Sequence, residues 1–75
     1  MNVTINRENF DRVMAEKGCS TLGEISRATG ISRPYLSQIL NGHRGVGMAF
    51  VTKMLTELEV PYTFAPDSIY QLEEA

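Results

Sequence analysis

Residues 25–42, ISRATGISRPYLSQILNG, contain two short helical patterns that a glycine separates. The first pattern ends at Gly30, because glycine readily adopts the left-handed conformation that closes a helix. Only two residues lie between Gly30 and the second pattern, which covers residues 33–41 and stops at Gly42. Two short helices joined by so tight a turn must cross steeply, so this segment predicts a two-helix corner.

The first helix of this corner has a clear beginning, and the second has two candidates. Thr21 and Glu24 fit a capping box, in which each side chain accepts a hydrogen bond from the other residue's backbone N–H, and they predict a helix over residues 22–29. For the second helix, Ser32 as N-cap makes Pro34 the second helical residue, whereas the restriction on a residue before proline favours Pro34 as the first. The boundary stays open by one residue.

Two further amphipathic patterns flank the corner. Asn6 is placed to cap a helix over residues 7–17, whose apolar residues recur at the spacing of one helix face. A broad apolar stripe predicts a fourth helix over residues 48–59. The predicted core consists of Phe10, Val13, Met14, Leu22, Ile25, Ile31, Leu36, Ile39, Val51, Met54, Leu55 and Leu58.

The two ends of the chain have a different pattern. Val3 and Ile5 alternate with polar residues, which is the period of a half-buried strand. Residues 62–64 and 69–72 are rich in aromatic and β-branched side chains on either side of a Pro-Asp turn, and they predict a C-terminal β-hairpin. A short fifth helix capped by Asp67 is the alternative.

Residues 25–42 resemble the helix-turn-helix of the phage-repressor and Cro-like (Xre) family of DNA-binding proteins. They have the glycine in the turn, apolar Ile31 after it, small polar Ser32, and Leu36 and Ile39 spaced toward the core before a closing Asn-Gly pair. The resemblance implies a mainly α, lambda-repressor-like domain of four helices that binds double-stranded DNA.

With the flanking helices the resemblance extends over residues 7–60. The chain departs from the family pattern at Ser26, where alanine is usual, and at Leu22, where a glutamine often contacts a phosphate. The C-terminal segment does not resemble the usual fifth helix of the family. We predict that residues 1–75 form a single DNA-binding domain, with the helix-turn-helix at residues 21–42 and a dimerisation segment at residues 61–75.

Helical geometry predicts the same surface without the family. At 100° per residue, Leu36, Ile39 and Leu40 lie on one face of the helix 33–41, and its polar residues lie on the opposite face. An exposed helix of this kind can enter the major groove. The predicted DNA-contact residues are Ser32, Arg33, Pro34, Tyr35, Ser37, Gln38, Asn41, His43 and Arg44.

Each of these side chains suits a particular contact. Arg33 can donate to guanine O6 and N7, and Gln38 can pair with adenine N6 and N7. Ser37 is short enough to let the backbone come close, and Tyr35 can reach a phosphate or a thymine methyl group. Residues 41–44 contain Asn41, His43 and Arg44 in a glycine-containing loop that can hold phosphate. The alternative for the polar face is simple solvation, and Asn41 can equally serve only to close the helix.

The charge is divided unevenly along the chain. Its net value is −2, but residues 20–53 carry Arg27, Arg33, Arg44 and Lys53 against Glu24 alone, whereas residues 54–75 hold five acidic residues and no basic one. Salt screens charges beyond about 8–10 Å, so the local basic segment can still face phosphates. The acidic end is expected to lie away from them.

Composition excludes several other classes. Seventy-five residues suffice for one small domain, and no apolar run has the roughly 18 residues that a membrane span requires. Cys19 is the only cysteine and His43 the only histidine, so we expect no disulfide within the chain, no metal site, no catalytic cysteine with a neighbouring base, and no cofactor. We expect a cytoplasmic protein that is not an enzyme and has no small-molecule ligand.

One helix-turn-helix contacts only a few base pairs, so useful specificity usually needs two copies on a near-palindromic site. The apolar ends of the chain are the candidate contact, and we predict a homodimer formed mainly through Tyr62, Phe64, Ile69 and Leu72. The alternative is that these side chains cover the core of their own chain. The predicted function is a dimeric, sequence-specific repressor of phage type, with an antitoxin-like interaction module or an acidic anti-repressor as alternatives.

Overall fold

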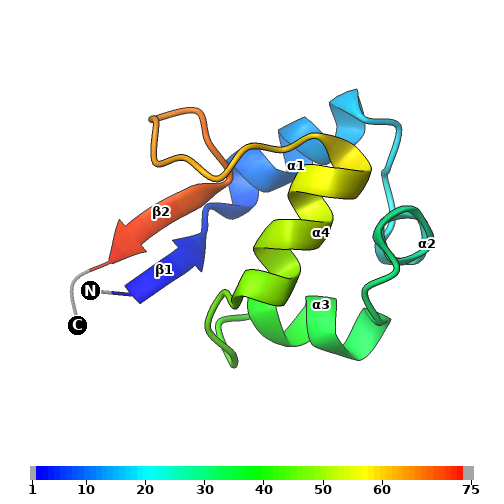
Figure 1. Ribbon diagram of the computed structural model, residues 1–75, viewed down its shortest axis with the longest axis horizontal. Helices are drawn as coiled ribbons and strands as arrows, with labels where there is room; N and C mark the ends of the chain where they lie inside the picture. Colours follow the sequence, from blue (N-terminus) through cyan, green and yellow to red (C-terminus); the bar gives the residue numbers. More distant parts are fainter. Residues whose placement is uncertain (1, 74–75) are drawn as a thin grey trace.

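The computed structural model describes residues 2–73 of the chain. Its four helices surround one core, and a two-stranded sheet closes the side where the two ends of the chain meet (Figure 1). In chain order the elements are β1 (Asn2–Ile5), α1 (Arg7–Glu16), α2 (Leu22–Thr29), α3 (Arg33–Leu40), α4 (Met48–Leu58) and β2 (Tyr70–Glu73). The predicted fold class of a four-helix helix-turn-helix domain is confirmed.

The helices begin where local capping chemistry places them. The Asn6 side chain accepts a hydrogen bond from the backbone N–H of Asn9 at 3.0 Å, and Thr21 and Glu24 form the expected capping box. Ser32 is the N-cap of α3, so the open boundary is settled with Pro34 as the second helical residue. Helices α1, α3 and α4 each end one residue earlier than predicted.

Eleven of the twelve predicted core residues are buried or partly buried, but the prediction wrongly included Leu55 and left out the buried residues Ile5, Cys19, Phe50, Val60, Ile69 and Tyr70. Leu36, Phe50 and Met54 have no exposed surface and lie at the centre of the core. Leu55 is 50% exposed, so its assignment to the core was wrong. It lies one residue beyond Met54 on α4, where the 100° step turns the side chain out of the narrow buried stripe of that helix. The buried apolar residues are Ile5, Phe10, Met14, Cys19, Ile25, Ile31, Leu36, Ile39, Phe50, Val51, Met54, Val60, Ile69 and Tyr70, with Val13, Leu22 and Leu58 partly buried against them.

The sheet corrects the expected pairing of the C-terminal segment. β2 is a strand, as predicted, but it pairs antiparallel with β1 in the register Asn2↔Glu73 to Ile5↔Tyr70. Residues 62–64, the expected first arm of the hairpin, belong to no strand. The described residues contain no fifth helix.

Hydrogen bonds to α1 account for this pairing. The Asn9 side chain donates to the backbone oxygens of Pro66 and Ser68 at 2.9 and 2.8 Å, and the Arg12 guanidinium donates to that of Asp67 at 2.8 Å. The backbone N–H of Asn6 donates to the Ile69 oxygen at 2.8 Å. These bonds hold the turn against α1 and direct the chain after it toward β1 instead of back toward residues 62–64.

Candidate nucleic-acid interface

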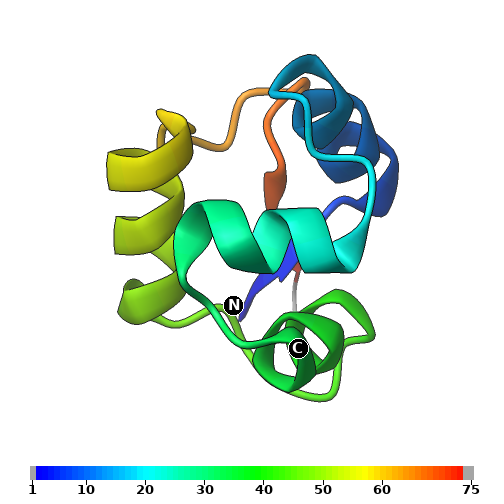
Figure 2. The same cartoon turned by 90° about the vertical axis from the view of Figure 1, so that its right-hand side faces the viewer.

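The two-helix corner is built as its sequence predicts. Figure 1 shows α2 end-on and α3 lengthwise, and Figure 2, turned by 90°, shows α2 lengthwise and α3 end-on. The two helices therefore cross steeply. Gly30 ends α2 with φ at 78°, a left-handed conformation that favours glycine. The Thr29 hydroxyl donates to the Ile25 oxygen at 2.7 Å and accepts from the N–H of Ile31 at 3.2 Å. The Ser26 hydroxyl, where alanine is usual in the family pattern, donates across the turn to the Ile31 oxygen at 2.6 Å.

Helix α3 has one buried and one exposed face. Leu36 and Ile39 are buried and Leu40 is partly buried, as the helical spacing predicts. The opposite face of α3 is exposed to solvent and is not covered by another element among the described residues. Of the predicted contact residues, Ser32, Arg33, Pro34, Gln38, Asn41, His43 and Arg44 are exposed, and Tyr35 and Ser37 are half-buried.

Arg33 lies at the first position of α3, and its guanidinium folds back over the first turn of α2. A Cβ atom placed on Gly23 would come within 2.5 Å of Arg33 Nη2. The absence of a side chain at Gly23 therefore makes room for the guanidinium, and Arg33 is exposed at the meeting point of the two helices.

The loop after α3 returns to the helix. Gly42 takes a left-handed φ of 77°. The backbone N–H groups of His43 and Arg44 both donate to the backbone oxygen of Gln38, at 2.8 and 3.2 Å. Arg44 Nε donates to Gln38 Oε1 at 2.9 Å, and the guanidinium carbon lies 5.0 Å from the centroid of the Tyr35 ring. Tyr35, Gln38 and Arg44 thus form one contiguous group.

The remaining predicted residues lie along the same face. Asn41 is the C-cap of α3, and its side chain donates to the Ser37 hydroxyl at 3.1 Å. The Ser32 hydroxyl accepts from the N–H of Tyr35 at 3.4 Å and so caps the helix. The structure places the nine predicted residues on α3, at its N-cap Ser32, and in the segment that follows the helix.

Sequence reasoning missed the other side of this surface. A groove of about 360 Å³ runs along α3, where Ser37 and Asn41 face Arg7, Ser20 and Thr21. These three residues come from the start of α1 and the turn before α2. No local pattern singles them out, because only the packing of α1 and α2 against α3 brings them there.

The first turn of α2 carries a carboxylate with a lowered pKa. Hydrogen bonds from the backbone N–H groups of Ser20 and Thr21 to Glu24 Oε1, at 2.9 and 3.0 Å, stabilise the charged form and hold the pKa of this carboxyl below its usual value. The charge of Glu24 is therefore committed to the capping box.

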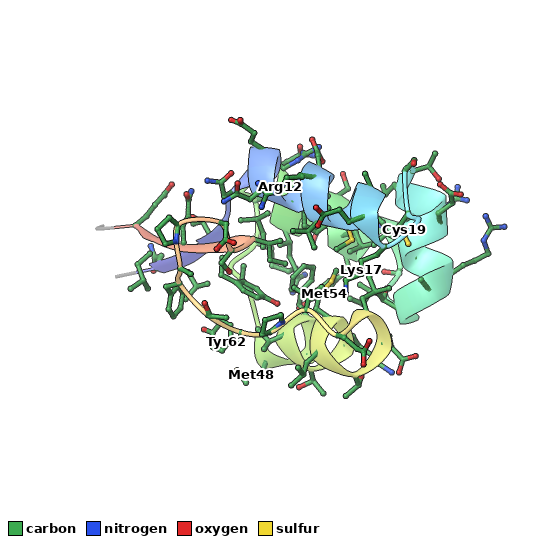
Figure 3. The ribbon with its side chains drawn as sticks, turned by 90° about the horizontal axis from the view of Figure 1, so that it is seen from above. Arg12, Lys17, Cys19, Met48, Met54 and Tyr62 are labelled. Atoms are coloured by element: carbon green, nitrogen blue, oxygen red, sulfur yellow. The ribbon has the colours of Figure 1, made fainter. Side chains whose placement is uncertain are left out.

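Residues 2–73 contain neither a cluster of metal-binding side chains nor a helix that could span a membrane. In that part of the chain no three His, Cys, Asp or Glu side chains gather closely enough to hold a metal ion. None of the helices described there has the length and apolar character to cross a membrane. Cys19 lies buried in the link between α1 and α2 (Figure 3).

A comparison with family models identifies the fold. The helix-turn-helix model matches residues 16–64, well over half of the chain. This chain belongs to the helix-turn-helix family of phage-repressor and Cro-like (Xre) proteins. It is therefore a DNA-binding transcription regulator of that family, in which α3 occupies the position of the recognition helix. Comparison with curated proteins and with solved structures finds no match to the chain.

The predicted dimer residues lie elsewhere on the molecule. Tyr62 and Phe64 are 41% and 44% exposed. They belong to the connection between α4 and β2, which Figures 1 and 2 show on the opposite side of the molecule from α3. Leu72 on β2 is 48% exposed, whereas Ile69 is 1% exposed and belongs to the core of its own chain. Ile69 is thus unavailable to a partner, because its side chain fills the space between the sheet and the helices. Residues 74–75 of the predicted dimerisation segment lie outside the described residues.

Proposed function

We propose that this protein is a sequence-specific repressor that places α3 in the major groove of a near-palindromic operator. The observation that carries the proposal is the unused hydrogen-bonding capacity of the exposed face of α3. Arg33 and Gln38 lie there with donors that the fold does not consume, and Arg and Gln are the side chains that bind base edges in pairs of hydrogen bonds. Each such pair contributes about 1–3 kcal/mol of discrimination between bases.

Phosphate contacts fix the register of the protein on the duplex. Asn41 and His43 are exposed at the end of α3. Arg7, which forms an exposed ion pair with Asp11 at 3.8 Å, and Thr21 lie across the groove from Asn41. Groups on both sides of a helix that enters the major groove can bind the two phosphate strands that border it. This arrangement supports a docking pose in which α3 lies along the groove and the starts of α1 and α2 face one strand.

The proposed active form is a homodimer joined through the exposed aromatic end. Tyr62 contacts Phe64 edge-on at 5.4 Å between ring centroids and contacts Tyr70 at 4.9 Å, which makes an apolar surface continuous with the core (Figure 3 labels Tyr62). β1 and β2 form a sheet of two strands, so each has an edge that another strand can pair with.

Selection from a pool of random-sequence duplexes tests the DNA-binding proposal. The protein is expected to enrich one near-palindromic motif, and its affinity is expected to fall as salt rises, because phosphate contacts release counterions. Binding that shows no preferred motif would contradict sequence-specific function, and a protein that binds no duplex at all would support the anti-repressor alternative.

Sedimentation tests the dimer, with point variants in place of a truncation. Removing the chain after Pro61 would delete the buried Ile69 and Tyr70 and unfold the domain. Phe64→Ser and Leu72→Ser change only exposed side chains and are expected to shift the protein from dimer to monomer. Leu55→Ser on α4 is the matched control, since Leu55 is similarly exposed but lies outside the proposed contact. A wild-type protein that stays monomeric at tens of micromolar and on its operator refutes the dimer.

A further inference from the structure

The loop residue Arg44 is bound to the very side chain that is expected to contact a base. Arg44 Nε donates to Gln38 Oε1 at 2.9 Å, and the Arg44 guanidinium lies over the Tyr35 ring at 5.0 Å. An arginine that served only as a phosphate contact would be expected to extend into solvent as a flexible charge. Here the guanidinium has an aromatic surface beneath it and an amide beside it.

The backbone makes this contact a built-in feature of the fold. The backbone oxygen of Gln38 accepts hydrogen bonds from the backbone N–H groups of His43 and Arg44. The loop is thus anchored to the same residue whose side chain binds the Arg44 guanidinium. Gly42 supplies the left-handed turn that reverses the chain at the end of α3. Tyr35 and Gln38 lie three residues apart on α3 and so share a side of the helix. The position of Arg44 is therefore set by the loop, by the ring and by the amide together.

The contact changes what Gln38 can offer to DNA. A glutamine that pairs with adenine must accept a hydrogen bond from N6 while it donates to N7. In this structure the bond from Arg44 Nε takes one of the two lone pairs of Gln38 Oε1 and turns that oxygen toward the loop, whereas no hydrogen bond within residues 2–73 uses the amide NH₂ of Gln38. No hydrogen bond within residues 2–73 uses the Nη donors of Arg44 either. The two bonded side chains therefore offer free N–H donors, and the base edge with two adjacent acceptors in the major groove is that of guanine, with N7 and O6.

We propose that Arg44 is a positioning residue for Gln38, and that the Tyr35–Arg44–Gln38 group selects guanine where an isolated Gln38 would select adenine. The inference rests on the proposed DNA-binding function and replaces the simpler expectation that Arg44 only binds phosphate. It makes a residue outside the recognition helix a determinant of base choice.

The decisive variant is Arg44→Lys, which keeps the positive charge but lacks the guanidinium that donates to Gln38 and stacks on Tyr35. Selection with the wild-type protein and with Gln38→Ala identifies the base that Gln38 contacts, and that base is expected to be guanine, with discrimination of about 5- to 150-fold. With Arg44→Lys, discrimination at that base is expected to fall to the level of Gln38→Ala while the salt dependence of binding stays at the wild-type slope. Arg27→Lys, the same change at an exposed arginine of α2, is the control and is expected to retain discrimination.

A measurement on the free protein separates the failure of this inference from the failure of the proposed function. The side-chain NH₂ resonances of Gln38 are expected to shift in Arg44→Lys and in Tyr35→Leu, and to stay near their wild-type values in Tyr35→Phe, which keeps the ring. A wild-type protein that enriches no duplex motif refutes the proposed function alone. Unchanged Gln38 resonances in Arg44→Lys, or an Arg44→Lys protein that keeps wild-type base discrimination, overturn the positioning role. A strong preference for adenine at the Gln38 base overturns the selection of guanine.

Discussion

Two regions of this small domain use their polar side chains in opposite ways. In the terminal region, which comprises residues 2–12 and 60–73, Asn9 and Arg12 donate to backbone oxygens more than fifty residues away in sequence and hold the turn before β2. In the helix-turn-helix region, residues 21–44, the side-chain hydrogen bonds of α3 and its loop reach only near neighbours in the sequence, as Asn41 binds Ser37 and Arg44 binds Gln38. Polarity alone therefore does not mark a ligand site. The side chains whose bonds the fold can do without are the ones available to DNA.

The largest expected effect concerns the core beneath α3. Leu36 has no exposed surface, so Leu36→Ala is expected to lower the free energy of unfolding by about 2–5 kcal/mol, through lost burial and the cavity left behind. Urea denaturation measures the change. Leu55→Ala, at a half-exposed position, is expected to cost far less. Similar losses at the two positions would show that the buried face of α3 has been misassigned.

The terminal region is expected to weaken in alkali. Burial, with a smaller contribution from Tyr62, raises the pKa of Tyr70 from 10 to about 12. Between these values the unfolded chain has lost the phenolic proton and the folded chain has kept it, so stability falls as pH rises. The loss attributable to Tyr70 is expected to reach about 2–3 kcal/mol in full, of which roughly half is present by pH 11.

Urea denaturation of the wild type and Tyr70→Phe at pH 8 to 11 isolates this effect. The Tyr70 hydroxyl is buried without a hydrogen-bond partner among residues 2–73, so removing it is expected to leave stability at pH 8 equal or higher. The variant is expected to lose less stability than the wild type above pH 10. Parallel curves for the two proteins would show that Tyr70 is solvated in the folded state.

Asn9 stabilises the fold and Asn41 contributes little to it, so replacing each with alanine is expected to lower the free energy of unfolding by unequal amounts. Asn9→Ala removes two hydrogen bonds to the turn before β2 and is expected to cost about 1–2 kcal/mol. Asn41→Ala removes one exposed bond to Ser37 and is expected to change stability by less than about 0.5 kcal/mol while weakening DNA binding. Thermal melting and duplex titration of both variants give the four values. An Asn41→Ala protein that is the less stable of the two would break the contrast.

A smaller effect is expected at the local cap of α2. Thr21→Ala removes the hydroxyl that accepts from the Glu24 N–H at 3.1 Å and is expected to cost about 1 kcal/mol. Thr21→Ser, which keeps a hydroxyl, is the matched control for the melting temperature. A Thr21→Ala protein that melts with the wild type would show that the capping box contributes nothing measurable to α2.

The same contrast explains which features the sequence could predict. The helix-turn-helix region depends on neighbours a few residues apart, such as the Thr21–Glu24 box and Gly30, so its helices and the exposed face of α3 follow from spacing and capping. The pairing of β2 depends on a partner at the other end of the chain, and the local Pro-Asp turn signal favoured the wrong one. The contact of Arg44 with Gln38 escaped prediction for a related reason, since it exists only after the loop folds back on α3.

The chemical shifts of the labelled protein, followed during titration with its selected duplex, test the central claim most directly. The claim is that the spare polar face of α3 and its loop binds DNA, and that the side chains of the terminal region serve the fold and the dimer. We expect the largest shift changes at residues 32–44 and at the starts of α1 and α2, with little change at residues 62–73. Changes centred on the sheet and residues 62–73, with α3 unaffected, would contradict the claim.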